Sequence, residues 1–239
     1  MAFSPLLTDL VVLLAGIALV TILFIRMRPR RFYFVRHGET TLNAERIRQG
    51  EDGDLSAVGQ TQADRAGAYL AEAGIHKILA STYERAKETA EIIEKHLGAP
   101  IVYSDLLVER KNPSEIVGKS ADDLEVKRVV DLVDLAYHDD SYRYSDEENF
   151  IDLKRRAQKA LAYLEAQPER EICVVTHGIF LKMLIAYLLY RERLSADDYI
   201  KLAFFNASDN GHITICEYHP WKRFSTTGGW EVVSYNETP

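Results

Sequence analysis

The stretch RFYFVRHGETTLN, residues 31–43, places an arginine, a histidine and a glycine directly after a strand pattern. Its apolar residues FYFV, 32–35, are aromatic or β-branched, which predicts a short buried strand. In α/β proteins, ligands bind in the crevice at the carboxyl ends of parallel strands. We therefore expect Arg36 and His37, at the end of this strand, to line the floor of a pocket.

Apolar runs alternate with helical patterns from residue 32 onward. Further strands are predicted at 77–81, 101–104, 171–176, 212–218 and 230–235. Helices are predicted at 56–73, 83–97, 122–136, 147–165 and 179–189. This alternation predicts βαβ units, whose parallel strands are covered by helices on both faces. We expect an α/β three-layer sandwich with a mostly parallel central sheet, preceded by one N-terminal transmembrane helix.

The segment before the first strand differs from the rest of the chain. Residues 10–25 are almost entirely apolar, and Leu6 and Leu7 extend the run to about 20 residues, enough at ~1.5 Å per residue to span a bilayer core of ~30 Å. Arginines follow the run, whereas a signal peptide carries them before it, and the positive-inside rule puts them in the cytoplasm. We expect a membrane anchor with a basic juxtamembrane segment at 1–31 and a cytoplasmic globular domain at 32–239.

Composition and charge argue against several classes of protein. The 239 residues carry a formal net charge of −7 with a pI near 5.6, whereas nucleic-acid-binding proteins present basic surfaces. Cys173 and Cys216 lie in separate apolar runs without a C-x-x-C pair, so we expect reduced thiols rather than a disulfide or a zinc site. The sequence GKS at 118–120 resembles the end of a P-loop, but Pro113 stands where that motif needs glycine. We expect no nucleic acid, no metal and no cofactor.

Residues able to act on a phosphate follow four of the predicted strands. Besides the pair after the first strand, Arg85 stands near the start of the helix after the second, Glu109 follows the third, and His177 follows the fourth. If these strand ends lie together, they form a pocket with two histidines, two arginines and one carboxylate. Gly38 and Gly178, beside the histidines, are expected to let the backbone approach a phosphate closely.

This set of side chains suits phosphoryl transfer through a phosphohistidine. The charge of a transferring phosphoryl group is spread over its oxygens, so catalysis rests on positioning and electrostatic stabilisation. Arg36 and Arg85 can donate forked hydrogen bonds to those oxygens. Nearby arginines also disfavour protonation of the imidazole, which keeps His37 a neutral nucleophile. We expect His177 to bind the transferring group, and Glu109 to protonate the leaving oxygen and then activate water.

Two of these positions have alternative interpretations. Arg85 could be an exposed helix arginine paired with Glu84 or Glu88. Glu109 could be a solvated loop acid, in which case Glu115 is the rival proton donor. Both alternatives stay open at the level of the sequence.

The chain also carries, in order, the motifs VRHGETTLN, QGEDGDLSAVGQTQA, ILASTYERAKETAEII, LLVER and VVTHG. In order and approximate spacing it resembles the histidine phosphatase superfamily, also called the phosphoglycerate mutase-like family, in its larger R-H-G-E-T branch. The resemblance covers about residue 32 to the end and implies a catalytic domain in which His37 is phosphorylated and Glu109 is the proton donor. It implies a phosphate pocket completed by Arg36, Arg85 and His177 and lined by Asn43 and Gln49.

Two features depart from the family pattern. Thr82 stands where relatives often have proline, and Glu109 is followed by RKNPSEIVGKS rather than by the H-Y-G or aromatic-Gly pattern familiar in mutases. The resemblance therefore favours a metal-independent phosphatase that hydrolyses small phosphomonoesters, and the apolar N-terminal run is expected to anchor it to a membrane. A phosphoglycerate mutase-type phosphotransferase and an inactive phospho-ligand binding module are the alternatives. The segment 112–150 is expected to form either a lid over the pocket or a solvated loop, and the substrate and the oligomeric state stay open.

Overall fold

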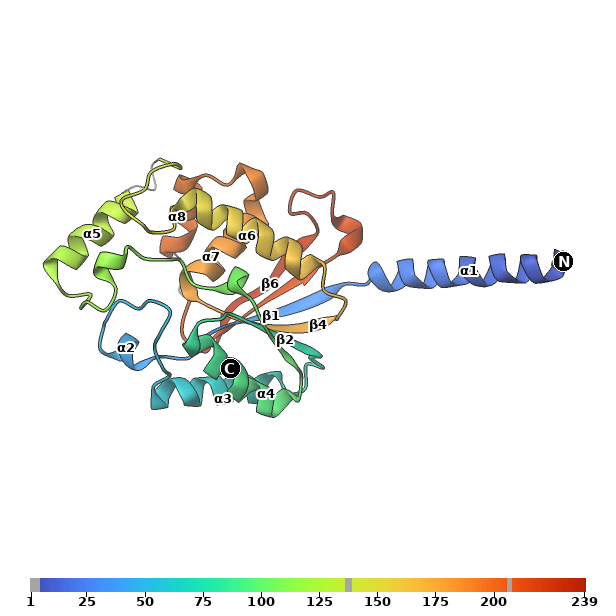
Figure 1. The fold of residues 1–239 in the computed structure, drawn as a ribbon, viewed down its shortest axis with the longest axis horizontal. Helices are drawn as coiled ribbons and strands as arrows, with labels where there is room; N and C mark the ends of the chain where they lie inside the picture. The colour runs from blue at the N-terminus through green and yellow to red at the C-terminus, as the bar shows by residue number, and fades with distance from the viewer. Residues whose placement is uncertain (1–4, 136–138, 206–207) are drawn as a thin grey trace.

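A mixed six-stranded sheet forms the centre of the molecule in this computed structural model (Figure 1). The structure describes residues 5–135, 139–205 and 208–239. Within the first helix it describes the side chains of residues 9–21. The strands are β1 (Arg30–Arg36), β2 (Lys77–Ala80), β3 (Ile101–Tyr103), β4 (Glu171–Thr176), β5 (Ile213–Tyr218) and β6 (Trp230–Glu237). All six lie at the predicted apolar runs. Their order in the sheet is β3-β2-β4-β1-β5-β6.

Neighbouring strands are parallel on one side of β1 and antiparallel on the other. β4 lies between β1 and β2 and is parallel to both, with Val174 opposite Phe34, and β2 is parallel to β3. β5 is antiparallel to β1, and β6 is antiparallel to β5. The predicted α/β class is confirmed, with a mixed sheet. Because β1, β4 and β2 are parallel neighbours, their carboxyl ends lie side by side.

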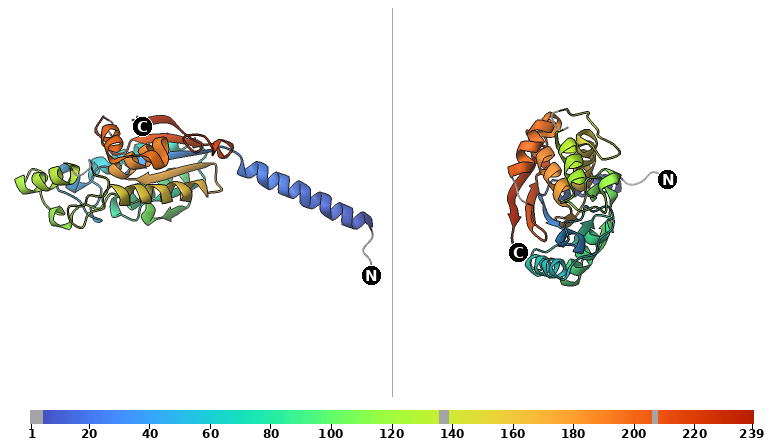
Figure 2. Two further views of the ribbon diagram at one scale, coloured as in Figure 1. Left: turned by 90° about the horizontal axis from the view of Figure 1, so that it is seen from above. Right: turned by 90° about the vertical axis from the view of Figure 1, so that its left-hand side faces the viewer.

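Helices cover both faces of this sheet (Figures 1 and 2). The helices are α1 (Pro5–Arg26), α2 (Thr41–Ala44), α3 (Ala57–Leu70), α4 (Glu84–Leu97), α5 (Leu124–Leu135), α6 (Phe150–Glu165), α7 (Gly178–Tyr190) and α8 (Ala196–Phe205), with 3-10 turns η1 (Asp105–Leu107), η2 (Ser114–Ile116), η4 (Arg191–Arg193) and η5 (Pro220–Lys222). Phe32 and Phe34 of β1 belong to the apolar cluster beneath α6 and α7, whereas Tyr33 and Val35 belong to the one beneath α3 and α4. This alternation follows from the two-residue period of a strand.

The segment 112–150 contains regular structure of its own. η2 and α5 share a small apolar cluster of Ile116, Val126, Val129 and Val133. An isolated β-bridge between Ile47 and Ser120 ties the segment to the loop that follows β1. The segment is therefore packed against the domain rather than being a fully solvated loop.

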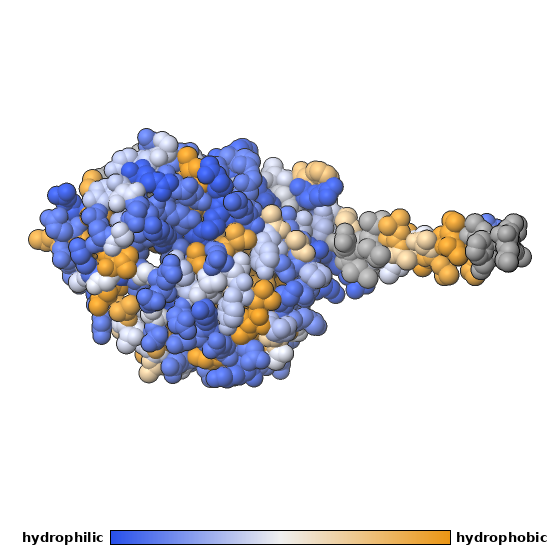
Figure 3. All heavy atoms as spheres, in the orientation of Figure 1, coloured by the Kyte–Doolittle hydropathy of each residue, from blue (hydrophilic) through white to orange (hydrophobic). Residues whose placement is uncertain are grey.

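The helix α1 extends away from the domain (Figures 1 and 2). Its described side chains, residues 9–21, are exposed, and apolar residues cover its described surface (Figure 3). Within the described residues, no helix combines the length and the apolar character needed to cross a membrane. The predicted N-terminal transmembrane helix is therefore not supported.

Candidate active site

His37 lies directly after β1 and is buried, with 3% of its surface exposed. Its backbone N–H donates to the carbonyl of Thr176 in β4 at 3.0 Å. Its Nδ1 lies 2.7 Å from the carbonyl oxygen of Gly38. Since a carbonyl only accepts, Nδ1 carries the ring proton and Nε2 holds the lone pair. Arg85 Nε donates to that Nε2 at 3.3 Å.

The surroundings of His37 keep its imidazole neutral. Burial lowers the pKa of His37 well below 6.5, and the positive charges of Arg85 and Arg36 lower this pKa further. A neutral imidazole that carries its lone pair on Nε2 is a nucleophile at neutral pH.

Arg36, the last residue of β1, is held by the chain that precedes β5. One of its terminal nitrogens, Nη1, donates to the carbonyl of Ser208. Within the described residues, its buried Nε has no hydrogen-bond partner. This Nε is a donor available to an anion.

Arg85 stands near the start of α4 and is also buried, with 3% of its surface exposed. Its Nη1 donates to the carbonyl of Gly50 at 3.0 Å and lies within 3.5 Å of the next two carbonyls along the chain. Glu84 instead pairs with Lys87 at 3.2 Å, and Glu88 accepts from the backbone N–H of Leu55 at 2.8 Å. The alternative of an exposed Arg85 paired with either glutamate is therefore wrong.

His177 follows β4 and is fully buried beside His37, with 5.0 Å between the ring centroids. Its Nε2 lies 2.8 Å from the hydroxyl oxygen of Ser81, and its Nδ1 has no partner within the described residues. Burial lowers the pKa of His177 well below its usual value, and the charge of Arg85 adds to this effect. Both histidines are thus neutral at pH 7.

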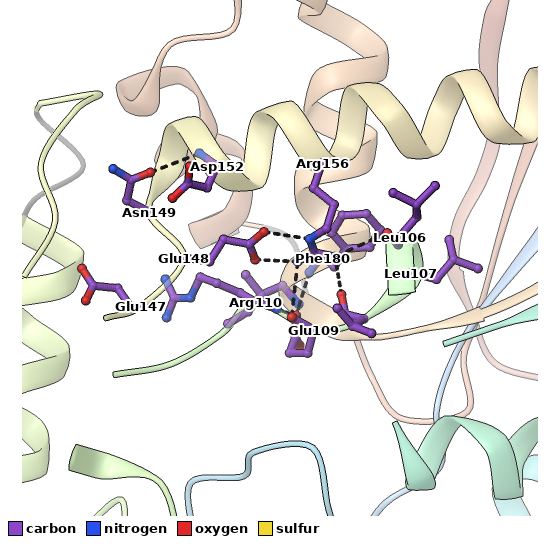
Figure 4. Close-up of polar contacts among 12 residues, drawn as sticks. Leu106, Leu107, Glu109, Arg110, Glu147, Glu148, Asn149, Asp152, Arg156 and Phe180 are labelled. Carbon is purple, nitrogen blue, oxygen red and sulfur yellow. Dashed lines mark hydrogen bonds and ion pairs between the residues drawn. The ribbon is translucent and has the colours of Figure 1, made fainter. Parts of the chain in front are cut away.

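The carboxylate of Glu109 sits at the N-terminus of α7, the helix that begins directly after His177 (Figure 4). It accepts backbone N–H bonds from Ile179 at 3.1 Å and Phe180 at 2.9 Å, and from Arg110 at 2.9 Å. The positive end of a helix dipole favours a negative charge at this position. Glu109 therefore occupies the same helix end as His177.

The rival acid Glu115 occupies a different environment. It is exposed and hydrogen-bonded to Tyr144. It is also absent from the residues that line the cavity in which Glu109 lies. Between the two candidates, the geometry favours Glu109 as the acid.

A cavity of about 670 Å³ opens beside Glu109 and Tyr83. The loop after β1 and the chain after Glu109 line it, with Leu42, residues 47–52, residues 110–112, Ser114, Val117 and Gly118. Gln49 lies on the wall of this cavity, and its role in binding the phosphate stays a prediction. Asn43 does not line the cavity: its side-chain oxygen accepts from the backbone N–H of Thr40 at 3.2 Å in the capping box of α2.

Of the described residues of the segment 112–150, Asn112, Ser114, Val117 and Gly118 line this cavity. If the segment formed a lid, its tyrosines and aspartates would be the residues to cover the pocket, but Asp139, Asp140, Tyr142 and Tyr144 lie outside the residues that line the cavity, and Tyr137 falls outside the described residues. Within the described residues, the segment therefore forms a wall of the cavity through its N-terminal part.

The two glycines expected to let the backbone approach a phosphate also lie at close packing contacts. A Cβ at Gly38 would lie 2.3 Å from the carbonyl oxygen of Gly59, and a Cβ at Gly178 would lie 3.2 Å from Arg36 Nε. The absence of a side chain at Gly38 thus lets the start of α3 pack against it, and the absence of one at Gly178 leaves room for the Arg36 side chain.

Three residues of the site were not found from the sequence. Ser81 contacts His177 and directly follows β2, so the search for polar residues after strands could have found it. Thr89, one turn after Arg85, accepts from the backbone N–H of Gly38 at 3.1 Å. Asn210 donates to the carbonyl of His37 at 2.8 Å from the chain before β5, where no sequence pattern marks it.

The family model of the histidine phosphatase superfamily (branch 1) matches residues 32–238. The chain belongs to this superfamily. The resemblance seen in the sequence is thereby confirmed, and the protein falls in a class of phosphatases and mutases.

The relatives of this histidine phosphatase superfamily member include proteins named as mutases and proteins named as phosphatases. The probable phosphoglycerate mutase GpmB of Salmonella arizonae is 35% identical over 159 residues, which is 66% of this chain and 74% of the relative. The uncharacterized phosphatase PhoE of Bacillus subtilis is 33% identical over 153 residues, which is 63% of this chain and 73% of the relative. The roles of the individual site residues stay predictions.

Solved structures share the fold of this superfamily member. Bacillus stearothermophilus YhfR matches with a TM-score of 0.71 at 26% identity, covering 88% of this chain and 98% of that one. A mycobacterial glucosyl-3-phosphoglycerate phosphatase matches with a TM-score of 0.69 at 24% identity, covering 87% and 99%. The second similarity concerns the fold alone.

Proposed function

We propose that the protein is a phosphatase that hydrolyses phosphomonoesters through a phosphohistidine on His37. The observation that carries the proposal is the fixed ring of this histidine: Nδ1–H is bound to Gly38 O, and Nε2 faces Arg85 Nε. An imidazole held in this tautomer presents one lone pair, next to a permanent cation that can bind the attacked phosphoryl group.

In the first step, His37 Nε2 attacks phosphorus and the bond from phosphorus to the ester oxygen breaks. Arg36 Nε and the Arg85 guanidinium donate to the non-bridging oxygens, with His177 beside them. Glu109 gives a proton to the leaving oxygen, so an alcohol departs into the adjacent cavity.

In the second step, water hydrolyses the phosphohistidine. Glu109, now a carboxylate, takes a proton from the water as its oxygen bonds to phosphorus. The phosphorus–nitrogen bond breaks, the electron pair returns to Nε2, and inorganic phosphate leaves.

The test is hydrolysis of p-nitrophenyl phosphate by the purified 239-residue chain in the presence of a chelator. His37→Gln should lower kcat by at least about 1,000-fold, because loss of a nucleophile removes the whole covalent route. The exposed control His76→Gln should leave kcat unchanged. Enzyme mixed with radiolabelled substrate and quenched in alkali should carry label that acid then releases, because the phosphorus–nitrogen bond is stable in alkali and labile in acid. Absence of such label, together with an active His37→Gln variant, would falsify the mechanism.

A mutase is the second candidate, and the relatives named probable phosphoglycerate mutase favour it. A mutase keeps its histidine phosphorylated and returns the phosphoryl group to the substrate rather than to water. The two are separated by incubating the enzyme with a phosphoglycerate: a mutase interconverts the isomers faster than it releases phosphate. We expect phosphate release to be faster, whereas an inactive binding module would do neither.

The location of the chain stays a prediction from its sequence. The apolar run followed by arginines predicts a membrane-associated chain with the domain on the cytoplasmic side. Sedimentation of the chain with membranes is the first measurement. Protease added from outside intact cells should then leave the domain uncut, and digestion of the domain would contradict the predicted orientation.

A further inference from the structure

The backbone that carries Glu109 is held by a single arginine of α6. Arg156 Nη1 donates to the carbonyls of Val108 at 2.6 Å and Leu106 at 3.4 Å, and Nη2 donates to the carbonyl of Glu109 at 3.3 Å (Figure 4). Leu106 belongs to η1, and Val108 and Glu109 lie in the connection that follows it. One guanidinium thus bridges the three carbonyls that lead up to the proposed acid.

The guanidinium is itself fixed on its other edge by Glu148. Arg156 Nε and Nη2 donate to the two carboxylate oxygens of Glu148 at 2.7 and 2.6 Å, and the two side chains are 14% and 15% exposed. Glu148 is anchored in turn, because its backbone N–H donates to the carbonyl of Lys111 at 3.0 Å. Such a bidentate pair has geometric specificity that a single point charge lacks.

The face of the guanidinium rests on Phe180, with 4.1 Å from Arg156 Cζ to the ring centroid. Phe180 is also the residue whose backbone N–H binds Glu109 Oε1. Arg156 therefore contacts both the backbone carbonyl of Glu109 and the ring of Phe180, the residue whose backbone N–H binds the Glu109 carboxylate (Figure 4).

We propose that Arg156, locked by Glu148, is a positioning residue that places the Glu109 carboxyl group at the leaving oxygen. This inference rests on the proposed function, in which Glu109 is the acid. Arg156 acts through the backbone of residues 106–109 and through Phe180. Loss of its forked contacts lets the Glu109 carboxyl group move, and a displacement of about 1 Å can cost about 100-fold in rate.

A role in proton donation makes a specific kinetic signature. A good leaving group such as dinitrophenolate departs without a proton, whereas phenolate or an alkoxide needs the acid. A displaced Glu109 therefore lowers kcat/KM for phenyl and alkyl phosphates but spares dinitrophenyl phosphate. A purely structural role for Arg156 would lower kcat/KM for all substrates alike.

The experiment measures kcat/KM of the full 239-residue chain on dinitrophenyl, p-nitrophenyl, phenyl and alkyl phosphates. Arg156→Gln and Arg156→Lys should lower kcat/KM about 30- to 100-fold for phenyl phosphate and less than about threefold for dinitrophenyl phosphate. Glu148→Gln should show the same selectivity with a smaller loss. The matched control is Arg155→Gln, since Arg155 is the exposed neighbour on the same helix and pairs with Asp152 at 3.7 Å; it should behave like the wild type.

Glu109→Gln separates failure of this inference from failure of the proposed function. If Glu109→Gln shows the leaving-group selectivity and the Arg156 and Glu148 variants lose rate equally on all substrates, the positioning role is wrong. If Glu109→Gln itself shows no selectivity, the proposed role of Glu109 as acid is wrong, and the positioning role falls with it. Thermal melts accompany each variant, and Arg156→Lys and Glu148→Gln decide the question if Arg156→Gln does not fold.

Discussion

Two neutral buried histidines at the active site tie the stability of the protein to pH. The folded-state pKa values of His37 and His177 lie well below their ordinary values, because of burial first and of Arg85 second, whereas an unfolded histidine titrates near 6.5. Below about pH 6.5 the unfolded chain therefore binds protons that the folded protein does not. Above about pH 6.5 these histidines therefore do not lower the free energy of unfolding. As the pH falls from about 6.5 toward their folded pKa values, they lower it progressively.

Replacing His177 by asparagine should weaken this acid sensitivity. The free energy of unfolding of the wild type should drop between pH 6.5 and 5.5 by up to about 1.4 kcal/mol more than that of His177→Asn, which is the limit for one histidine over one pH unit. Urea titrations at the two pH values provide the measurement. His76→Asn is the exposed control and should keep the wild-type drop. An equal drop in wild type and His177→Asn would contradict the prediction.

The contact between Ser81 and His177 should contribute to rate rather than to fold. Ser81 Oγ lies 2.8 Å from His177 Nε2 and orients the ring. Ser81→Ala removes this neutral hydrogen bond, worth about 1 kcal/mol, and also the one that Ser81 Oγ accepts from the backbone N–H of Tyr83 at 3.2 Å, so we expect kcat/KM to fall at least about fivefold. Thr61→Ala, which removes an exposed hydroxyl on α3, should have no effect. An unchanged kcat/KM in Ser81→Ala would mean that His177 needs no orientation by this hydroxyl.

At the scale of elements, His37, the proposed nucleophile, is placed by the packing of the chain that ends β1 against the start of α3. Gly38 and Gly59 bring the two backbones so close that a Cβ on Gly38 would lie 2.3 Å from Gly59 O. That oxygen is backbone and cannot rotate away, so a side chain at position 38 must push α3 and the end of β1 apart. The position of His37 depends directly on this contact.

Gly38→Ala should therefore damage stability and activity together. Overpacking of this kind costs about 1–3 kcal/mol, and displacement of His37 should lower kcat by about 100-fold or more. Gly74→Ala is a useful control, because Gly74 has a φ of +67° but no atom within 4 Å of the added Cβ. It should lose about 1 kcal/mol from its strained backbone while keeping kcat. Gly38→Ala with normal kcat would show that the two elements separate without moving the histidine.

For the whole molecule, the features that depend on local sequence patterns, namely the strand positions and the residues that follow the strands, could be predicted from the sequence. All six strands lie at the predicted runs, and Arg36, His37, Arg85, Glu109 and His177 meet because they follow strands whose carboxyl ends are neighbours. Strand order and the antiparallel pairing of β5 were not predictable, because pairing depends on contacts far apart in the chain. For the same reason, Asn210 and Arg156 could not be predicted. Asn210 donates to His37, 173 residues away, and Arg156 donates to Glu109, 47 residues away.

The outward course of α1 leads to a prediction about the whole chain. The described side chains of α1 are exposed, and the apolar clusters that hold the sheet contain none of them. Burial against the sheet is the main stabilising contribution, so removal of residues 1–26 should change the free energy of unfolding by less than about 0.5 kcal/mol. The truncated chain keeps Met27 and Arg30, and Arg30 Nη1 donates to the carbonyl of Glu165 at 3.0 Å. Urea unfolding of both chains in the same buffer measures the difference, and kcat/KM for p-nitrophenyl phosphate should match. A loss of more than about 1 kcal/mol would mean that the domain needs its N-terminal helix to fold, and the boundary predicted near residue 31 would then be wrong.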